Sequence, residues 1–532
     1  MNLVVGSGPS GVAAALALIE RGEPVTRLDV GRTLEPERAE IPRRLAGLDY
    51  EAWPAAERAR LAAVRGEVVG GYPRKTNFGS DFAYREDPAL MPLDVREAEI
   101  LASLARGGLS NIWGANLFSF CAADLDGWPL GAEDLAPAYR AILRHVPLSA
   151  ERGDDFESPH PLHADALEPR LLSEQARALL ADLGAHREAL HLRGMRFGAS
   201  RLAVRTAPAP GRAACVRCGL CLHGCPLDVI YSSAHTLALL ERQPGFRYLG
   251  GVCVRRFHES AGGVEIEAQD ASTGTPLTFE GARLFLGCGC YSTARILLES
   301  LGLYGDALTM RESQYFLIPL LHGRVFRRAP EERLQTLSQV CLRLADPAVA
   351  ARDVQMLIYT YSPLYRDAIA RSPARFVPGL GGALLGRLLA LQGYLHSDLS
   401  PSLALSLRRE GDGPPVLEVR GQRNPATVPV VRRIERTLRE LSGRTRATPI
   451  PFMTMIAPPG KSYHGGALFP MRRAPGPRDS DLLGRPMGLA RVHVVDASVF
   501  PSIPSTNLTL TLMANAWRIA SASGAPAASS AA

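Results

Sequence analysis

The sequence predicts an α/β fold that is organised around its first 31 residues. Residues 2–5 form a short apolar run that is typical of a buried strand, and an Ala/Leu-rich helix is expected over 12–20. A second strand is expected over 24–30. The first strand is joined to the helix by a glycine-rich turn, Gly6-Ser7-Gly8-Pro9-Ser10-Gly11. Strand, glycine turn, helix and strand in this order indicate a βαβ unit that binds a dinucleotide.

Three glycines and one acid carry this interpretation. Gly6 permits the sharp turn, Gly8 lets the backbone approach a pyrophosphate, and Gly11 lets the helix pack closely on the strand. Asp29 follows the second strand, where it can accept a hydrogen bond from a ribose hydroxyl. The alternative is a glycine-rich turn in an ordinary α/β protein, and the well-placed acid argues against it. The expected cofactor contacts in this unit are Gly6, Gly8, Pro9, Ser10, Gly11, Asp29, Gly31 and Arg32.

Length and composition are those of a globular protein. The chain has 532 residues, of which 46% are hydrophobic and 21% charged, and this length predicts about three domains. The net charge of +7 is spread over many arginines without a basic block, so nucleic acid is not expected as a partner. Because the first strand begins at residue 2, we expect no signal peptide and a cytoplasmic protein.

A second glycine-rich loop, Arg106-Gly107-Gly108-Leu109-Ser110-Asn111, follows an arginine-rich helical stretch over about 35–65. Two adjacent glycines followed by Ser and Asn supply backbone and side-chain donors that suit phosphates or a polar ring edge. The alternative is a plain loop.

A return to the nucleotide-binding sheet is expected near residue 285. Strands are predicted over 252–257, 263–268 and 277–285, and the last leads into Gly287-Cys288-Gly289-Cys290 and a helix. We interpret Cys288 and Cys290 as packing residues in that turn.

Four cysteines are clustered in the run Cys215-x-x-Cys218-x-x-Cys221-x-x-x-Cys225-Pro226. This spacing, with its trailing proline, matches the bacterial iron–sulfur run. Because the chain has one such run, we expect either a 4Fe-4S cluster held by all four cysteines or a 3Fe-4S cluster held by three. The alternatives are a structural zinc site, which more often uses two separated pairs of ligands, and buried thiols without a metal.

Residues 376–395 form an apolar stretch with one proline, four glycines before Arg387, and a single charge. About 20 apolar residues can span a bilayer, but the proline and the glycines disfavour a continuous helix. A buried segment or lid is the simpler interpretation. Peripheral docking to a membrane or a subunit is the alternative, because Arg371, Arg375 and Arg387 flank or enter the stretch.

Polar residues gather near the C-terminus. His464 lies in a glycine-rich loop, and Asp496 follows a strand expected over 491–495. Asn507 opens a helix that is expected to end near Ala520, so its side chain and the free amides there can face a ligand. An Ala/Ser-rich tail over 521–532 is expected to be disordered.

Together these features resemble the glucose–methanol–choline (GMC) family of flavoenzymes. The resemblance covers both ends of the chain and the 280–300 region, and its most specific part is 494–501 with 507–511. It implies an interrupted Rossmann-like FAD-binding domain and an α+β, sheet-based substrate domain over the flavin. The cysteine run is similar to that of a bacterial branch of dehydrogenases, including sugar dehydrogenases, that carry an iron–sulfur cluster.

The resemblance also implies a division of the chain. The FAD-binding domain takes 1–130, 241–310 and 461–520, and the substrate domain takes 311–460. A helical substrate and cluster segment with the cysteine loop 215–226 takes 131–240, and the tail takes 521–532.

Site roles follow from the same resemblance. His464 is similar to the family's base near the flavin, and Asn507 to a second active-site residue that is His or Asn in relatives. An imidazole can take the hydroxyl proton of an alcohol near neutral pH while a hydride moves to the flavin. The further FAD contacts expected are Arg106, Gly107, Gly108, Ser110, Asn111, Val252, Asp496, Ala497, Asn507, Leu508 and Thr509.

The sequence departs from the family pattern at three places. Ala467 follows the histidine loop where a threonine is common, and Leu508 stands where many relatives carry proline. The Gly107-Gly108 loop has no histidine, so FAD is expected to be bound non-covalently.

We therefore expect an FAD-dependent dehydrogenase that oxidises an alcohol group of a sugar or glycoside. A flavin takes two electrons and a cluster passes them singly, which suits delivery to a cytochrome, quinone or other carrier. A small accessory subunit is expected to dock near the cysteines, and periplasmic export is expected only if that subunit carries the signal. The alternatives are a redox-neutral FAD-containing lyase or isomerase, an oxygen-using oxidase, and a non-catalytic electron-transfer module.

Overall fold

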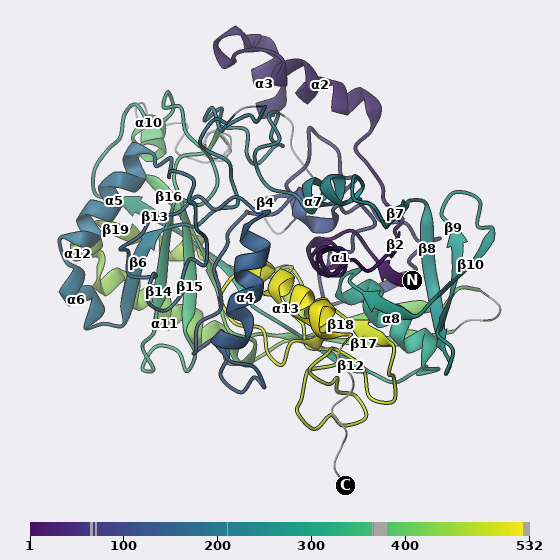
Figure 1. Ribbon diagram of the computed structural model, residues 1–532. Helices are drawn as coiled ribbons and strands as arrows, with labels where there is room; N and C mark the ends of the chain where they lie inside the picture. The colour runs from purple at the N-terminus through teal and green to yellow at the C-terminus, as the bar shows by residue number, and fades with distance from the viewer. Residues whose placement is uncertain are drawn as a thin grey trace.

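The computed structural model describes residues 1–63, 68–69, 72–209, 211–363, 365, 380–409, 411 and 413–524. A five-stranded parallel sheet binds the two ends of the chain together (Figure 1). Its order is β22 (Val492–Val494), β11 (Arg283–Leu286), β1 (Asn2–Val5), β2 (Val25–Leu28) and β7 (Phe246–Leu249). Buried Leu and Val fill β1, as the apolar run predicts.

The helices next to this sheet are α1 (Pro9–Glu20), α13 (Thr509–Ala522), α4 (Ala132–Leu143), α7 (Ser233–Leu240) and α8 (Cys290–Ser300). α13 packs against both α1 and α4, and α7 against α1. The small residues of α1 allow this close packing, because Ala13, Ala14 and Ala15 are fully buried. The predicted βαβ unit and the return of the chain near residue 285 are therefore confirmed.

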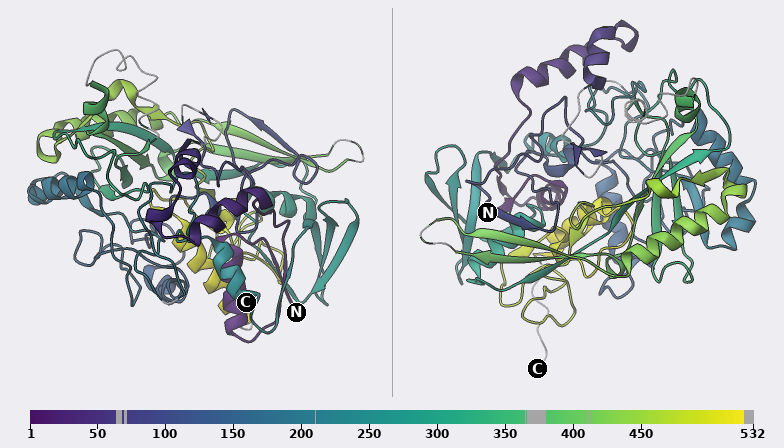
Figure 2. Two further views of the ribbon diagram at one scale, coloured as in Figure 1. Left: turned by 90° about the horizontal axis from the view of Figure 1, so that it is seen from above. Right: turned by 180° about the vertical axis from the view of Figure 1, so that it is seen from behind.

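A seven-stranded sheet lies on the opposite side of the molecule (Figure 2). Its strands are β19 (Ala447–Pro449), β13 (Tyr315–His322), β16 (Leu388–Tyr394), β15 (Val354–Tyr359), β14 (Val340–Leu344) and β6 (Met195–Ala199), with β20 (Met455–Ile456) on β13. Apolar side chains of α5 (Glu174–Gly184) and α11 (Thr427–Glu440) share a hydrophobic core with it. The short helices near it are α6 (Arg187–His191), α10 (Leu380–Leu385) and α12 (Ser442–Thr445).

The fold also contains two further sheets and one short two-stranded ribbon. A mixed five-stranded sheet contains β21 (Gly465–Gly466), β12 (Leu308–Glu312), β17 (Ser402–Arg408), β18 (Val416–Gln422) and β5 (Leu93–Arg96). An antiparallel sheet contains β10 (Pro276–Gly281), β9 (Val264–Asp270) and β8 (Val252–Glu259). The ribbon pairs β3 (Val68–Val69) with β4 (Tyr72–Pro73).

The single strand predicted over 277–285 is wrong. The structure divides it into β10 and β11, which belong to different sheets. Gly281 marks the break, because a Cβ there would lie 2.7 Å from Cγ of Leu3 in β1. Apolar residues on both sides of Gly281 made the two strands look like one in the sequence.

The arginine-rich stretch forms α2 (Pro36–Ala46) and α3 (Ala55–Ala63), joined through η1 (Tyr50–Ala52). The pair projects from the rest of the chain (Figure 1). Leu45, Trp53 and Leu61 form a small core with Leu220, against which Cys218 also packs. These helices therefore cover the cysteine loop.

The apolar stretch 376–395 is divided by the fold. Residues 376–379 lie outside the described residues, and the rest gives α10 and β16. Leu389 and Leu391 of β16 are fully buried, which agrees with a buried segment. Every helix in the described ranges is too short or too polar to cross a bilayer. At the C-terminus α13 continues to Ala522, and 525–532 lie outside the described residues.

Candidate active site

A cavity of about 540 Å³ opens at the carboxyl ends of the parallel strands. Val5 ends β1, Leu28 ends β2 and Gly287 follows β11, and all three line it. Ligands of open α/β sheets bind at this edge, and the volume lies in the range of about 300–1,000 Å³ that is usual for cofactor and small-molecule sites. The cavity also reaches the seven-stranded sheet, because Tyr359 and Tyr394 line it.

The first glycine turn and the N-terminus of α1 form one wall. Gly6 has a φ of +89°, and a Cβ on Gly11 would lie 2.1 Å from the carbonyl oxygen of Gly6. Both glycines are therefore required by the turn itself. Gly8, Pro9 and Ser10 line the cavity with the helix N-terminus. This wall can hold an anionic group such as a pyrophosphate.

The second glycine loop packs directly against the first at the cavity wall. A Cβ on Gly108 would lie 3.2 Å from Cα of Gly8, so a side chain there would crowd the passage. Gly107 donates its N–H to Oγ of Ser7 at 2.9 Å. Asn111 donates to the carbonyl oxygens of Arg106 and Gly108 at 3.0 and 2.8 Å. Asn111 therefore shapes the loop and does not line the cavity.

Asp29 closes one end of the cavity. Its carboxylate accepts hydrogen bonds from Ser7 and, at 3.1 Å, from the hydroxyl of Tyr248. Burial raises the pKa of Asp29 to about 6, although both hydrogen bonds oppose the shift. The side chain is ionised at neutral pH and can accept a further bond from a ligand hydroxyl.

His464 lies at the other end, in a loop that a buried carboxylate holds. Gly460 donates its N–H to both carboxylate oxygens of Glu312 at 2.9 and 2.8 Å, and Ser462 donates to Oε2 at 3.2 Å. Glu312 is 2% exposed, and burial raises its pKa to about 7. The ring of His464 stacks on Tyr394 with centroids 4.8 Å apart.

Burial also sets the charge of the histidine. It lowers the pKa of His464 to about 4, so the imidazole is neutral at physiological pH and has a nitrogen that can accept a proton. Nδ1 of His464 is buried without a hydrogen-bond partner among the described residues, and so is Oδ1 of Asn507. Both residues line the cavity, although these two atoms themselves are enclosed by protein.

Asp496 fixes the turn at the start of α8. Its Oδ2 accepts from the N–H of Gly289 at 3.0 Å, and its Oδ1 accepts from that of Ser498 at 3.0 Å. Burial raises the pKa of Asp496. Cys288 and Cys290 pack in this turn as predicted, and they also line the cavity.

The structure brings most of the predicted cofactor contacts to the cavity wall. Those that line it are Gly6, Gly8, Pro9, Ser10, Asp29, Gly108, Ser110, Val252, Asp496, Ala497, Asn507, Leu508 and Thr509. Six predicted contacts do not line it, namely Gly11, Gly31, Arg32, Arg106, Gly107 and Asn111. Arg32 instead pairs with Asp87, and Arg106 pairs with Glu241 at 2.6 Å. Their charges are taken by neighbouring acids, which the sequence pattern does not reveal.

The four cysteines converge on a second, small cavity. Cys215, Cys218, Cys221 and Cys225 all line it, and the space that it encloses is about 10 Å³. All four are free thiols, and burial raises the pKa of Cys225 to about 11. Leu222, next to Cys221, lines the large cavity. The cysteine loop therefore forms part of the wall of the large cavity.

Sequence reasoning missed three residues that build this site. Glu312 holds the His464 loop, Gln355 accepts the N–H of Asn507 at 3.0 Å, and Lys75 lines the large cavity. Burial lowers the pKa of Lys75 to about 8, while Cys221 and Cys225 are near enough to raise it. A lone Glu, Gln or Lys in the sequence gives no signal, because each acts through a partner far along the chain.

Comparison of this chain with known proteins indicates which enzymes it resembles. Residues 402–516 match the family described as GMC oxidoreductase. The C-terminal part of this chain is therefore similar to the GMC oxidoreductases. It is 25% identical over 559 residues to the 6'''-hydroxyparomomycin C oxidase of Streptomyces lividus, a match that covers 97% of this chain and 89% of that protein.

Two solved structures of oxidases share the fold of this protein. Pyridoxine 4-oxidase from Mesorbium loti aligns with a TM-score of 0.58 and 15% identity, over 98% of each chain. A formate oxidase variant of Aspergillus oryzae RIB40, described for its FAD modification, aligns with a TM-score of 0.61 and 12% identity, over 98% of this chain and 97% of that one. Together these matches indicate an FAD-dependent oxidoreductase that acts on CH–OH groups.

The large cavity fits FAD on the observations above. A helix N-terminus and two glycine turns suit the pyrophosphate, the ionised Asp29 suits a ribose hydroxyl, and His464 and Asn507 line the same cavity. When bound, FAD supplies a two-electron acceptor.

Asp29→Ala should weaken FAD binding by about 10–100-fold, because a charge-assisted hydrogen bond contributes roughly 1.5–3 kcal/mol. Titration of the apoprotein with FAD, followed by quenching of flavin fluorescence, measures this. Asp87→Ala is the matched control, because Asp87 pairs with Arg32 away from the cavity. Equal dissociation constants for Asp29→Ala and the unaltered protein would refute the assignment.

Proposed function

We propose that this protein is a dehydrogenase of the GMC type that oxidises an alcohol group of a sugar or glycoside and passes the electrons through an iron–sulfur cluster to an external acceptor. One observation carries the proposal. The loop that gathers four cysteines is also a wall of the FAD cavity, through Leu222. Two redox centres held there would be neighbours.

His464 and Asn507 supply the chemistry of alcohol oxidation. Because Nδ1 of His464 is enclosed by protein, we assign Nε2 as the nitrogen that accepts the substrate hydroxyl proton. The side-chain amide of Asn507 orients the same hydroxyl. The aromatic rings of Tyr359 and Tyr394 also line the cavity and help to exclude water from it.

The arrangement of the sulfurs supports a cluster over zinc. Four sulfurs bound to one zinc ion at about 2.3 Å lie about 3.8 Å from one another. No three of these four sulfurs lie within 4.8 Å of one another, although each lines the same small cavity. A multinuclear cluster accepts the wider spacing.

An oxygen-using alcohol oxidase is the second candidate function. The relatives reported above are named as oxidases, and one of them is named for a hydroxylated substrate, 6'''-hydroxyparomomycin C. A redox-neutral lyase or isomerase has no comparable support. Substrate-driven bleaching of the flavin band followed by reoxidation with air or with a phenolic dye separates the two functions. A dehydrogenase is reoxidised rapidly by the dye and slowly by oxygen, and an oxidase shows the reverse.

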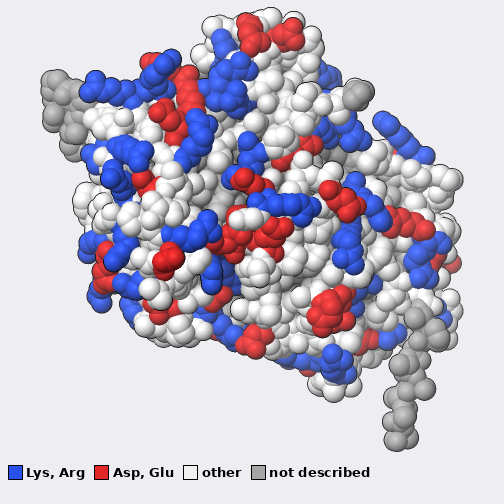
Figure 3. Space-filling model, turned by 60° about the vertical axis from the view of Figure 1, so that its left-hand side comes forward, with Lys and Arg blue, Asp and Glu red and all other residues white. Residues whose placement is uncertain are grey.

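Partners and location follow as proposals. A cytochrome, quinone or other carrier takes the electrons, and a small accessory subunit docks near the cysteine loop. The protein is exported to the periplasm if that subunit carries a signal, and is cytoplasmic otherwise. Basic and acidic side chains are interspersed on the face in Figure 3, which favours a protein or small-molecule partner over nucleic acid. Membrane contact, if made by 376–395, would use residues before β16.

The rate of flavin reduction should rise with pH through about 7. Glu312 is a carboxylate above its pKa of about 7 and then accepts from Gly460 and Ser462, whereas protonation below that pH weakens its hold on the His464 loop. His464 adds no step until near pH 4. Stopped-flow profiles from pH 5 to 9 measure this. Glu312→Gln should remove the step, and a step that persists in this variant would assign it to another group.

A further inference from the structure

The segment that carries Asn507 is held by two strands of the seven-stranded sheet. Asn507 donates its backbone N–H to Oε1 of Gln355 on β15 at 3.0 Å. Thr506, immediately before it, accepts from Nη1 of Arg343 on β14 at 3.1 Å and donates to Oδ2 of Asp124 at 2.8 Å. Thr506 and the backbone of Asn507 are therefore both tied to groups outside the parallel sheet.

Arg343 is the centre of this buried network and is 4% exposed. Its guanidinium donates to Oδ1 of Asp124 at 3.0 Å and to Oδ2 of Asp353 at 2.8 Å. It also contacts Nε2 of His160 at 2.6 Å. Burial and the neighbouring Arg343 charge lower the pKa of His160 to about 4, so its Nε2 is free to accept. Every direction of the planar guanidinium is thus fixed.

The same cluster could be mistaken for a metal site. Cys121, Asp124 and His160 place one possible ligand atom each within 4.8 Å of one another. The guanidinium of Arg343 contacts all three, with Sγ of Cys121 at 3.1 Å. The cationic place in this cluster is therefore already filled by Arg343.

A buried ion pair adds little net stability, because desolvation of both charges offsets their attraction. It does fix geometry, since each donor of the planar guanidinium points in one direction. In this network one of those directions ends at Thr506, which adjoins Asn507.

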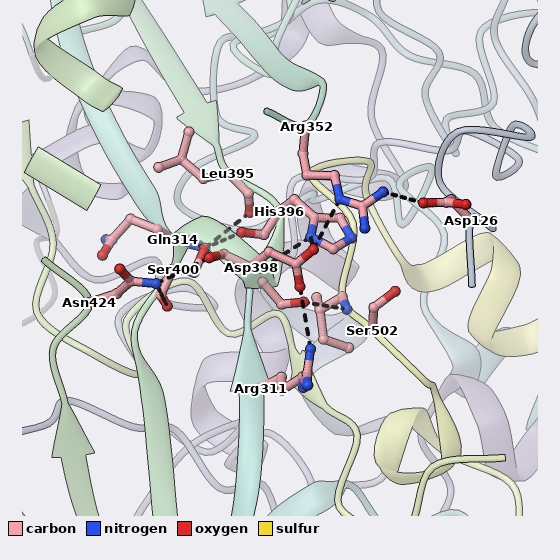
Figure 4. Close-up of polar contacts among 12 residues, drawn as sticks. Asp126, Arg311, Gln314, Arg352, Leu395, His396, Asp398, Ser400, Asn424 and Ser502 are labelled. Atoms are coloured by element: carbon pink, nitrogen blue, oxygen red, sulfur yellow. Dashed lines mark hydrogen bonds and ion pairs between the residues drawn. The ribbon is translucent and has the colours of Figure 1, made fainter. Parts of the chain in front are cut away.

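A second contact holds the same segment from its other side. Ser397 donates its backbone N–H to the carbonyl oxygen of Ile503 at 2.8 Å, and Ile503 donates its backbone N–H to Oγ of Ser397 at 3.2 Å. Ser397 begins the turn η4 (Ser397–Leu399). The carboxylate of Asp398 in this turn accepts hydrogen bonds from Arg311 at 3.3 Å and from Arg352 at 3.0 Å, as Figure 4 shows. The contact with Ser397 thus fixes the segment at Ile503. Arg343 and Gln355 fix it at Thr506 and Asn507.

We propose that Arg343 and Gln355 are positioning residues that hold the Asn507 amide where it meets the substrate hydroxyl. Arg343 acts through Thr506, and Gln355 acts on the Asn507 backbone. The inference rests on the role proposed above for Asn507. It makes the seven-stranded sheet set the geometry of the alcohol-oxidising site, although neither residue touches the substrate.

A double-mutant cycle tests this in the FAD-loaded protein. Arg343→Met should lower the rate of flavin reduction at saturating substrate by about 10–100-fold, with flavin content and KM nearly unchanged, because the loss is confined to the transition state. Arg343→Lys should recover part of the rate. Arg201→Met is the control, because Arg201 is also buried and pairs with Asp154 at 3.2 Å. It reaches this network only through the carbonyl oxygen of His160, without a hydrogen bond to Thr506.

The cycle with Asn507→Ala distinguishes the outcomes. If Arg343 acts through Asn507, Arg343→Met should cause no further loss in the Asn507→Ala background. An equal loss in both backgrounds would overturn the inference. A slow Asn507→Ala enzyme with a normal Arg343→Met enzyme would overturn it and leave the proposed function standing. A normal Asn507→Ala enzyme would remove the role of Asn507 itself, and the positioning role with it.

Gln355→Leu provides the same cycle where Arg343→Met fails to fold. Loss of the Oε1 acceptor should free the N–H of Asn507 and slow flavin reduction by about 10-fold, again with no effect in the Asn507→Ala background. A loss that persists in that background would contradict a positioning role for Gln355.

Discussion

His464→Ala is expected to leave FAD bound and to lower substrate-driven flavin reduction by about 10²–10⁴-fold, the contribution of a positioned general base. The imidazole is neutral because burial lowers its pKa to about 4, so it can accept a proton throughout the physiological range. Alanine removes the acceptor and leaves the cavity wall at Gly6, Gly8 and Asp29 intact. Flavin content therefore separates a chemical defect from a binding defect.

Anaerobic stopped-flow absorbance measures this effect, with the flavin band followed after substrate is added. His191→Ala is a suitable control. His191 lies on α6, is also partly buried and pairs with Asp155 at 2.8 Å, but it does not line the large cavity. Reduction of His464→Ala at the rate of the unaltered protein would remove the histidine from the mechanism.

Cys221→Ser should leave flavin reduction by substrate unchanged and slow the delivery of electrons to the external acceptor by at least about 10-fold. Loss of one thiolate ligand disrupts a cluster, whereas the FAD cavity keeps its glycine turns, His464 and Asn507. Iron and acid-labile sulfide should fall together in this variant. The two half-reactions would thereby be separated in one chain.

The control for this variant is Cys341→Ser. Cys341 is fully buried in β14 and lines neither cavity, so its replacement should keep the iron content and the rate of acceptor reduction. A Cys221→Ser enzyme with normal acceptor reduction would exclude an electron relay through the cysteine loop. Zinc in place of iron in the unaltered protein would exclude it as well.

The elements that sequence predicted well are those whose causes are local. The βαβ unit depends on Gly6 and Gly11, whose roles follow from a turn and a helix within ten residues. The spacing of the four cysteines likewise predicted that their side chains meet, because ligands within one loop can come together without contacts from distant parts of the chain.

The elements that sequence missed depend on contacts between distant residues. Glu312 meets Gly460 across 148 positions, and Gln355 meets Asn507 across 152. Arg32 looked like a cofactor contact because it follows the acid of the fingerprint, and its pairing with Asp87 depends on the tertiary fold. The support of the active site is thus specified by the packing of the sheets, which a motif does not encode.

An anaerobic titration with substrate, followed by absorbance and spin resonance on the same sample, tests most directly whether two redox centres share this chain. We expect the flavin band to bleach and a reduced iron–sulfur signal to appear with it, in protein that contains iron and sulfide. Yellow protein whose flavin bleaches without iron, sulfide or a spin signal would contradict the relay and leave an oxidase. Colourless protein that binds no FAD would contradict the flavin site itself.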